Sequence, residues 1–249
     1  MPARRFFTPG VRHGGAIVEI DGSDARKIVR VLRLRQGNAI DVIDSAGTLF
    51  PATILAAGPV VTATLGTPEP AVARAALRVD LAQALPKGSK MDFVVEKATE
   101  LGAGAILPFR SERTVADATE AKVERWQRLA AAASAQCGRR DVPPIEAPLQ
   151  SFEALLEAFR RYDAVVLAWE LAAPEPLRDR LPRALQGAHR ALLVVGPEGG
   201  FTHEEADAAA AHGAQAVWLG PRILRTETAA LVLLAVVDAL VPELPTSAS

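Results

Sequence analysis

The 249-residue sequence is short of the residues that build disulfides, zinc sites and membrane spans. It holds a single cysteine, Cys137, which excludes an intramolecular disulfide, and its four histidines are too scattered for a cysteine-based zinc site. The most apolar run, 229–237, is far shorter than the ~20 residues of a membrane-spanning helix. The opening MPARRFFTPG has no apolar segment like that of a signal peptide. We therefore predict a cytoplasmic, metal-free protein, with Cys137 as a small buried hydrophobic side chain.

The basic and acidic residues nearly balance overall but are unevenly placed along the sequence. The net charge is −1 and hydrophobic residues make up 49%, which is typical of a globular protein with a sizeable core. Residues 1–35 carry three acidic side chains against eight basic ones, a local charge of about +5. The basic residues are Arg4, Arg5, Arg12, Arg26, Lys27, Arg30, Arg33 and Arg35. Such a segment fits a polyanionic partner or an ordinary solvated surface, and charge alone does not separate the two.

The region up to about residue 70 has the pattern of a β-rich fold. The short runs AIVEI, AIDVID and PATILAA predict strands because they alternate or are β-branched and are separated by turn-forming residues. Residues 23–34 between them predict a helix with an apolar stripe of Ala25, Ile28, Val29 and Leu32 and a basic, wet opposite face. The stretch 66–76, which is rich in proline, glycine and alanine, predicts a linker.

From Leu77 onward, predicted strands and helices alternate. Strands are expected at 77–85, 105–109, 163–169, 191–196 and 216–219. Helices are expected between Ser89 and Gly102 and at 122–137, 202–213 and 227–240. Ser89 with Asp92, and Thr202 with Glu205, have the spacing of capping boxes. This alternation predicts a parallel sheet with helices on both faces.

Three loops that follow predicted strands are candidates for a ligand site: 167–170, 196–200 and 219–225. Ligands of open parallel sheets bind beyond the carboxyl ends of the strands, and glycine lets a backbone approach them closely. Neither glycine-rich loop has the Gly-x-x-x-x-Gly-Lys-Ser/Thr pattern, and GAGAIL precedes a strand instead of following one. An NTPase and a nicotinamide enzyme are therefore set aside. A tight turn would explain one such loop, whereas two favour a ligand.

Five segments in order give the sequence its resemblance to a known family: RRFFTPG, KGSKMDFVVEKATELG, AQCGRRDVPPI, VGPEGGFTHEE and LGPRILRTETA. Together they resemble the bacterial ribosomal RNA small-subunit methyltransferase E family, from Arg4 to about Leu240. The resemblance implies methylation of N3 of a uridine in small-subunit (16S) ribosomal RNA with S-adenosylmethionine. It also implies an RNA-binding PUA-like β-barrel at 1–70 and a SPOUT-type α/β domain at 71–249. In that domain the chain would form a trefoil knot, an exception to the rule against knots.

The resemblance also implies that the three loops form the knot and hold the cofactor. Residues without a Cβ would be needed where backbones cross, so the loop glycines are expected to serve packing as well as binding. The expected cofactor-binding residues are Leu167, Trp169, Gly196, Pro197, Glu198, Gly199, Gly200, Leu219, Gly220, Ile223, Leu224, Arg225 and Thr228.

Methylation at N3 of uracil requires loss of the N3 proton, which calls for a base or for cations that stabilise the uracil anion. Glu198 is the candidate base; Glu227 is an alternative that is equally suited to the N-terminus of the last helix. Arg225 is expected to stabilise the anion or hold a phosphate, although a surface salt bridge would explain it nearly as well. RNA contacts are expected from Arg4, Arg5, Arg12, Arg26, Lys27, Arg30 and Arg33, with Phe6 and Phe7 beside them as base contacts or core residues.

The last predicted helix lacks a polar face over 229–237, which predicts either a homodimer through the α/β domain or burial within the monomer. Two other functions stay open. The same fold could methylate another RNA position, such as a ribose 2′-hydroxyl. Alternatively, the protein could be a non-catalytic RNA-binding assembly factor that does not bind S-adenosylmethionine.

Overall fold

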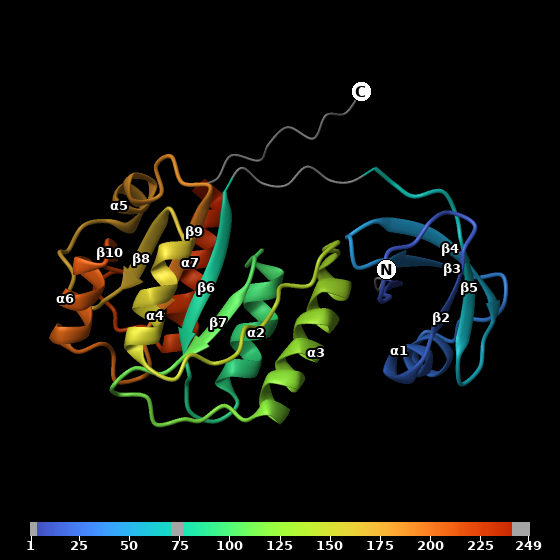
Figure 1. The fold of residues 1–249 in the computed structure, drawn as a ribbon, viewed down its shortest axis with the longest axis horizontal. Helices are drawn as coiled ribbons and strands as arrows, with labels where there is room; N and C mark the ends of the chain where they lie inside the picture. The colour runs from blue at the N-terminus through green and yellow to red at the C-terminus, as the bar shows by residue number, and fades with distance from the viewer. Residues whose placement is uncertain (1–3, 71–76, 241–249) are drawn as a thin grey trace. The chain divides into compact units, whose positions relative to one another are not determined.

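A computed structural model describes residues 4–70 and 77–240, which form two compact units (Figure 1). The described residues of the first unit are 4–70 together with 131–142, and those of the second are 77–130 and 143–240. Sequence patterns did not predict that 131–142 would join the first unit. Most of the predicted linker, residues 71–76, lies outside the described residues, so its structure stays a prediction.

The first unit contains a five-stranded sheet in the order β1-β3-β4-β5-β2. The strands are β1 Arg5–Phe7, β2 Ile17–Ile20, β3 Ala39–Ile43, β4 Leu49–Ala56 and β5 Val61–Leu65. The β1–β3 pair is parallel and the other pairs are antiparallel. The three predicted strands are confirmed as β2, β3 and β4, whereas the short β1 and the strand β5 were not predicted.

The predicted basic helix is shorter and less regular than expected. It consists of α1, Gly22–Arg26, followed by a π-helical turn at Lys27–Val31. Of the predicted apolar stripe, only Ala25 and Ile28 are fully buried. Val29 and Leu32 are partly buried and pack against the same core, so the predicted apolar stripe is confirmed although a π-helical turn interrupts the 3.6-residue period.

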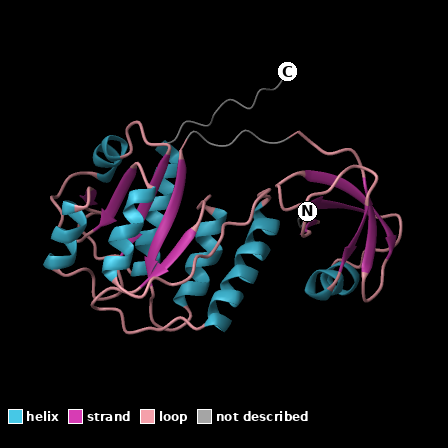
Figure 2. Cartoon of the chain, in the orientation of Figure 1, coloured by secondary structure: helices cyan, strands magenta, loops and turns pink. Residues whose placement is uncertain are grey.

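The second unit contains five parallel strands in the order β10-β8-β9-β6-β7, which confirms the predicted parallel sheet. These are β6 Arg78–Ala84, β7 Ile106–Phe109, β8 Ala164–Ala168, β9 Arg190–Val195 and β10 Ala214–Val217. The last strand begins two residues before the predicted 216–219. Although β9 follows β8 in the chain, it lies between β8 and β6 (Figure 2).

Helices cover both faces of this sheet, as predicted. In Figure 1, α4 (Phe152–Ala158) lies in front of the sheet and α7 (Thr226–Leu240) behind it. Phe152 on α4 packs against Phe109 and Phe201, whose rings are stacked 6.4 Å apart. The other helices are α2 Lys90–Glu100, α3 Glu120–Cys137, α5 Leu177–Ala184 and α6 His203–Ala211. Helices α4 and α5 were not predicted.

The two predicted capping boxes have different outcomes. The Thr202–Glu205 box is present at the start of α6, with both reciprocal hydrogen bonds formed. The Ser89–Asp92 box is wrong, because Ser89 caps α2 without a side-chain hydrogen bond. Asp92 instead accepts a 3.0 Å hydrogen bond from Trp126 Nε1 and pairs with Arg125. The expected burial of Cys137 is also wrong, because this residue is exposed at the end of α3.

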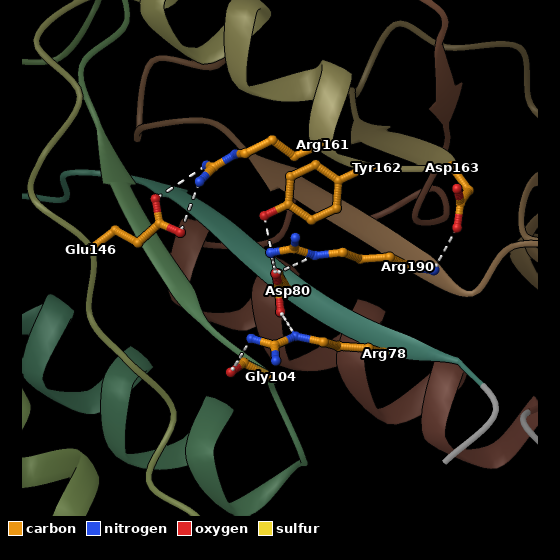
Figure 3. Close-up of polar contacts among 8 residues, drawn as sticks. All are labelled: Arg78, Asp80, Gly104, Glu146, Arg161, Tyr162, Asp163 and Arg190. Atoms are coloured by element: carbon orange, nitrogen blue, oxygen red, sulfur yellow. Dashed lines mark hydrogen bonds and ion pairs between the residues drawn. The ribbon is translucent and has the colours of Figure 1, made fainter. Parts of the chain in front are cut away.

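A polar cluster ties the strands together at their amino ends (Figure 3). The Asp80 side chain is fully buried and accepts hydrogen bonds from Arg78, Tyr162 and Arg190 at 2.8–3.0 Å. Burial, followed by the Asp80 carboxylate, raises the pKa of Tyr162 well above its usual range, so its hydroxyl stays a donor. Gly104 also touches this cluster, because an added Cβ would lie 2.6 Å from Asp80 Oδ1. The cluster therefore links β6 to β9 and to the start of β8.

Among residues 4–70 and 77–240, no helix is long and apolar enough to cross a membrane. The same residues contain no group of three or more histidine, cysteine, aspartate or glutamate side chains placed to hold a metal ion.

Candidate functional site

The three predicted loops meet at the carboxyl ends of neighbouring strands and line one pocket of about 630 Å³. One wall is 168–170 after β8, the second is 195–201 at the end of β9, and the third is 218–226 after β10. Most of the residues that were expected to bind the cofactor line this pocket. The two exceptions are Leu167, which is buried within β8, and Thr228, which is exposed on α7 and outside the lining. The pocket also includes Lys90, Phe201 and Trp218, which were not predicted.

A buried polar chain fixes the β9 loop to the start of α7. Thr226 Oγ1 donates a hydrogen bond to the carbonyl oxygen of Gly196. Gln83 Nε2 on β6, which is fully buried, donates to Thr226 Oγ1 at 2.8 Å. The hydroxyl is therefore donor to one segment and acceptor from another, so it sets the distance between two walls of the pocket.

The conformation of the β9 loop requires glycine at Gly200. Its φ of 68° lies in the left-handed region, where an L-residue is strained. A Cβ at this position would also lie 2.4 Å from Oε1 of Glu170, which belongs to the β8 loop. The left-handed φ is therefore the reason for glycine here, because the Glu170 carboxylate is the end of a flexible side chain; the expected role of the loop glycines where backbones cross stays a prediction.

The loop after β7 braces the β9 loop from outside the pocket. Arg113 Nη1 donates to the carbonyl oxygens of Gly199, at 2.7 Å, and Phe201, at 3.4 Å. Glu205 Oε1 accepts a 2.8 Å hydrogen bond from the Glu112 backbone N–H. Arg113 was not predicted, because it stands in no recognisable spacing and acts through its contacts with a loop that is distant in sequence.

Charged side chains gather along one wall. Lys90 Nζ lies 2.7 Å from Glu198 Oε1 and 3.8 Å from Glu227 Oε2. Glu198 Oε1 also accepts a hydrogen bond from the Lys87 backbone N–H at 3.1 Å. Burial acts to raise the pKa of Glu198, but the Lys90 hydrogen bond and nearby backbone N–H groups lower it on balance. Glu198 is therefore ionised and is a weaker base than an unpaired glutamate.

The two candidates Arg225 and Glu227 are placed differently. Arg225 is exposed, lines the pocket and forms no ion pair with any described residue. Its guanidinium is therefore accessible to an anionic ligand. Glu227 lies in the first turn of α7, where a carboxylate is favourable, and does not line the pocket.

The other part of the pocket is aromatic and apolar. Trp169, Trp218, Leu219 and Ile223 line it. The indole Nε1 of Trp169 is buried and has no hydrogen-bond partner among the described residues, and its ring packs edge-on against His203 at 5.4 Å. A buried donor without a partner is unfavourable unless a ligand or water accepts from it. The pocket therefore suits a ligand with a flat, polar-edged ring system and charged groups at the other end.

The basic residues expected to contact RNA divide into two groups within the first unit. Arg4, Arg26, Arg30 and Arg33 are exposed. Arg5, by contrast, donates to the carbonyl oxygens of Gly138 and Arg139 and lies 3.7 Å from Asp41. Arg12 donates to the Pro9 carbonyl oxygen, and Lys27 lies over the ring of Phe6. Phe6 itself is a core residue. The exposed group is therefore more available to a polyanion, and Arg5 chiefly holds 131–142 against the sheet.

Comparisons with known proteins show which family the chain resembles. A family described as an RNA methyltransferase domain matches residues 73–238. The chain is 36% identical over 227 residues to a ribosomal RNA small subunit methyltransferase E from Synechocystis, covering 90% of this chain and 74% of that relative.

Two solved structures share the fold over almost the whole chain. One is a methyltransferase from Legionella pneumophila in complex with S-adenosylmethionine, at 29% identity and a TM-score of 0.84. The other is a ribosomal RNA small subunit methyltransferase E from Neisseria gonorrhoeae bound to S-adenosylmethionine, at 31% identity and a TM-score of 0.82. Each comparison covers 96% of this chain and 98% of the other.

Removing the Thr226 hydroxyl should weaken the link between the β9 loop and the start of α7. Thr226→Val keeps the shape but removes the donor to the Gly196 carbonyl and one of the two acceptors of Gln83 Nε2, which still donates to the Ala84 carbonyl, so we expect a loss of about 1–3 kcal/mol in unfolding free energy. Thr226→Ser, the matched control, should retain most of the stability. Urea unfolding followed by circular dichroism measures both. A valine variant as stable as wild type would show that this hydrogen-bond chain does not hold the pocket.

Proposed function

The chain belongs to the RNA methyltransferase domain family, among the ribosomal RNA small subunit methyltransferases E, and we propose that it methylates N3 of one uridine. It acts on small-subunit ribosomal RNA with S-adenosylmethionine as cofactor. The observation that carries the proposal is that three strand-end loops form one pocket with an aromatic part and a charged wall. We also propose that the protein acts in the cytoplasm, because its substrate is ribosomal RNA.

The pocket fits S-adenosylmethionine in size and in chemistry. Its volume of about 630 Å³ lies within the range of small-molecule sites. Trp169 and Trp218 line the pocket and offer aromatic surface to an adenine. The loops 196–200 and 219–225 offer backbone groups close to the ligand because their glycines carry no Cβ. When bound, the cofactor supplies a methyl group on a sulfonium, and the pocket walls align it with the acceptor nitrogen.

The side chains of the charged wall have separate tasks in this proposal. Glu198 is the candidate acceptor of the N3 proton, because its ionised carboxylate lines the pocket. Arg225 is the candidate contact for an RNA phosphate or for the uracil anion, because its guanidinium has no ion-pair partner among the described residues. Removing the N3 proton creates the negative charge that a nearby cation stabilises.

We also propose that the second unit is a SPOUT-type domain with a trefoil knot. Two features support this: β9 is inserted between β8 and β6, and Thr226 bonds to the Gly196 carbonyl across neighbouring loops. An electron-density map traced through 164–240 would test it; a chain that never threads through a loop of its own would refute the knot.

We propose that residues 1–70 form a PUA-like RNA-binding domain and that residues 71–249 perform the chemistry. Exposed Arg4, Arg26, Arg30 and Arg33 support the first assignment. Contacts of this kind bind phosphates and add salt-sensitive affinity without reading sequence.

Replacing Arg4, Arg30 and Arg33 together by alanine should weaken RNA binding and flatten its salt dependence, by about 0.7 in log–log slope for each lost phosphate contact. Arg128→Ala is the matched control, since Arg128 is an exposed arginine on α3 beside Glu124. Fluorescence anisotropy at several salt concentrations measures the slope. An unchanged slope in the triple variant would move the RNA surface elsewhere.

We propose a homodimer through α7. Ala230, Leu233 and Val237 are buried within the monomer, but Leu231, Val232, Ala235 and Val236 remain partly or fully exposed. Phe93 on α2 is also exposed. An apolar surface of this kind is typical of an interface.

Light scattering should give about twice the mass of one chain, and Val236→Glu should reduce it to one mass by placing a charge in the interface. A wild-type monomer that is active at the same concentration would refute the dimer.

The methylated nucleoside tests the proposed activity directly. The purified protein, S-adenosylmethionine and unmodified small subunits are incubated, and the digested RNA is analysed by mass spectrometry with a no-enzyme control. We expect N3-methyluridine as the new nucleoside. A 2′-O-methylated product would support the other RNA position instead. No methylation, together with no cofactor binding by calorimetry, would support an assembly factor.

A further inference from the structure

Lys90 brings a cation to the pocket wall between two carboxylates. The three groups come from distant segments: Lys90 opens α2, Glu198 lies in the loop after β9, and Glu227 lies in the first turn of α7. Lys90 lines the pocket, with 33% of its side chain exposed, whereas Glu227 is only 13% exposed and lies behind it. Lys90 is therefore the member of this group, together with Glu198, that a bound base can reach.

The Lys90–Glu198 pair presents a donor and an acceptor side by side. Lys90 Nζ can donate three hydrogen bonds, and Glu198 accepts only. The Watson–Crick edge of uracil offers the complementary pattern, a carbonyl oxygen next to the N3–H donor. Cytosine offers the opposite pattern at the same two positions, an amino donor next to an unprotonated N3. The pair therefore matches uracil and disfavours cytosine.

We propose that Lys90 is a catalytic residue that binds the uracil carbonyl oxygen next to N3 while Glu198 accepts the N3 proton. This rests on the proposed methylation of uracil N3. The N3–H bond breaks and its proton passes to Glu198, which leaves an electron pair on the ring. N3 uses that pair to form its bond to the methyl group, and the electrons of the broken methyl–sulfur bond stay on the cofactor sulfur. Glu198 then releases its proton to solvent.

The need for a cation follows from the charge states of the pair. The hydrogen bond from Lys90 to Glu198 is the largest cause that raises the pKa of Lys90, so the ammonium persists at neutral pH. The lowered pKa of Glu198 makes it a weak acceptor for the proton of uracil, which is itself a weak acid. Proton transfer becomes favourable when the uracil anion is stabilised, and a preorganised ammonium does this. The charged groups around Lys90 are Glu198, Glu227 and Arg225.

The cofactor's own carboxylate is the other anion that Lys90 could bind. Glu198 and Glu227 already surround the ammonium with negative charge at 2.7 and 3.8 Å, and they would repel a third carboxylate. A ring carbonyl carries less charge and meets less repulsion. The geometry therefore favours the uracil over the cofactor as the partner of Lys90.

The test compares Lys90→Met with Lys97→Met, which removes the same charge about two turns further along α2. Lys97 pairs with Glu96 and Glu100 outside the pocket, so its variant is a matched control. Calorimetry gives the affinity for S-adenosylmethionine. Single-turnover methyl transfer is measured at neutral and alkaline pH, on RNA that carries uridine or 5-fluorouridine at the target position. Fluorine makes N3–H more acidic, so the ring ionises with less stabilisation from a nearby cation.

We expect Lys90→Met to bind the cofactor within about twofold of wild type and to transfer methyl groups about 100-fold more slowly at neutral pH. The deficit should shrink at alkaline pH and on 5-fluorouridine, because the ring then ionises more easily. Lys90→Arg should recover part of the rate, and Lys97→Met should match wild type.

Three results would overturn the proposal. A wild-type rate in Lys90→Met would remove Lys90 from the reaction. Cofactor affinity weakened by about tenfold or more would assign Lys90 to the cofactor carboxylate. An equal deficit at every pH and on both RNAs would show a structural role. If the wild-type protein methylated an atom other than N3, the proposed function itself would be refuted. The wild-type product is identified before the variants are compared, so this outcome is distinguishable from the three above.

Discussion

The adjacency of β10, β8 and β9 in one parallel sheet is the constraint on which the pocket depends. Because β10, β8 and β9 are neighbours and run parallel, the loops that follow them all begin at the carboxyl ends of the strands, on the same side of the sheet. In simple chain order β9 would lie between β8 and β10, whereas here β8 lies between β10 and β9, so the β8 loop stands between the two glycine-rich loops. Gly200 of the β9 loop lies close to Glu170 of the neighbouring β8 loop, and Thr226 after β10 donates a hydrogen bond to the Gly196 carbonyl oxygen.

The two ends of the sheet use buried polar groups differently. At the amino ends, the Asp80 carboxylate joins the strands by accepting hydrogen bonds from three side chains, so both of its oxygens have partners. At the carboxyl ends, the Trp169 N–H has no partner among the described residues, and Lys90 stands between two carboxylates. Unsatisfied or shared polar groups are costly in a core, and they are expected where a ligand completes them. The contrast separates a structural cluster from a binding site within one unit.

Local patterns were sufficient for the parallel sheet, the Thr202–Glu205 capping box and the three candidate loops, because each depends on residues close in sequence. They failed where contacts between segments distant in sequence determine the local structure. The predicted Ser89–Asp92 box is absent because Asp92 bonds to Trp126 on another helix. The predicted regular helix at 23–34 is instead a short α-helix followed by a π-helical turn, although its apolar stripe still packs against the core. Lys90 and Arg113 acquire their places only when α2 and the loop after β7 pack beside the β9 loop, so no spacing along the chain could reveal them.

We propose that the three loops form the cofactor site. Trp169 and Trp218 line the pocket, whereas Trp126 lies on α3 with its N–H bonded to Asp92, so tryptophan fluorescence reports on the site. The most direct measurement is a fluorescence titration with S-adenosylmethionine of wild type, Trp169→Phe and Trp126→Phe. We expect a saturable change in tryptophan fluorescence in wild type and in Trp126→Phe. We expect a smaller change and an affinity reduced by about tenfold in Trp169→Phe, because the ligand loses contact with the larger indole ring. An unaltered titration of Trp169→Phe, with the signal lost in Trp126→Phe, would contradict it.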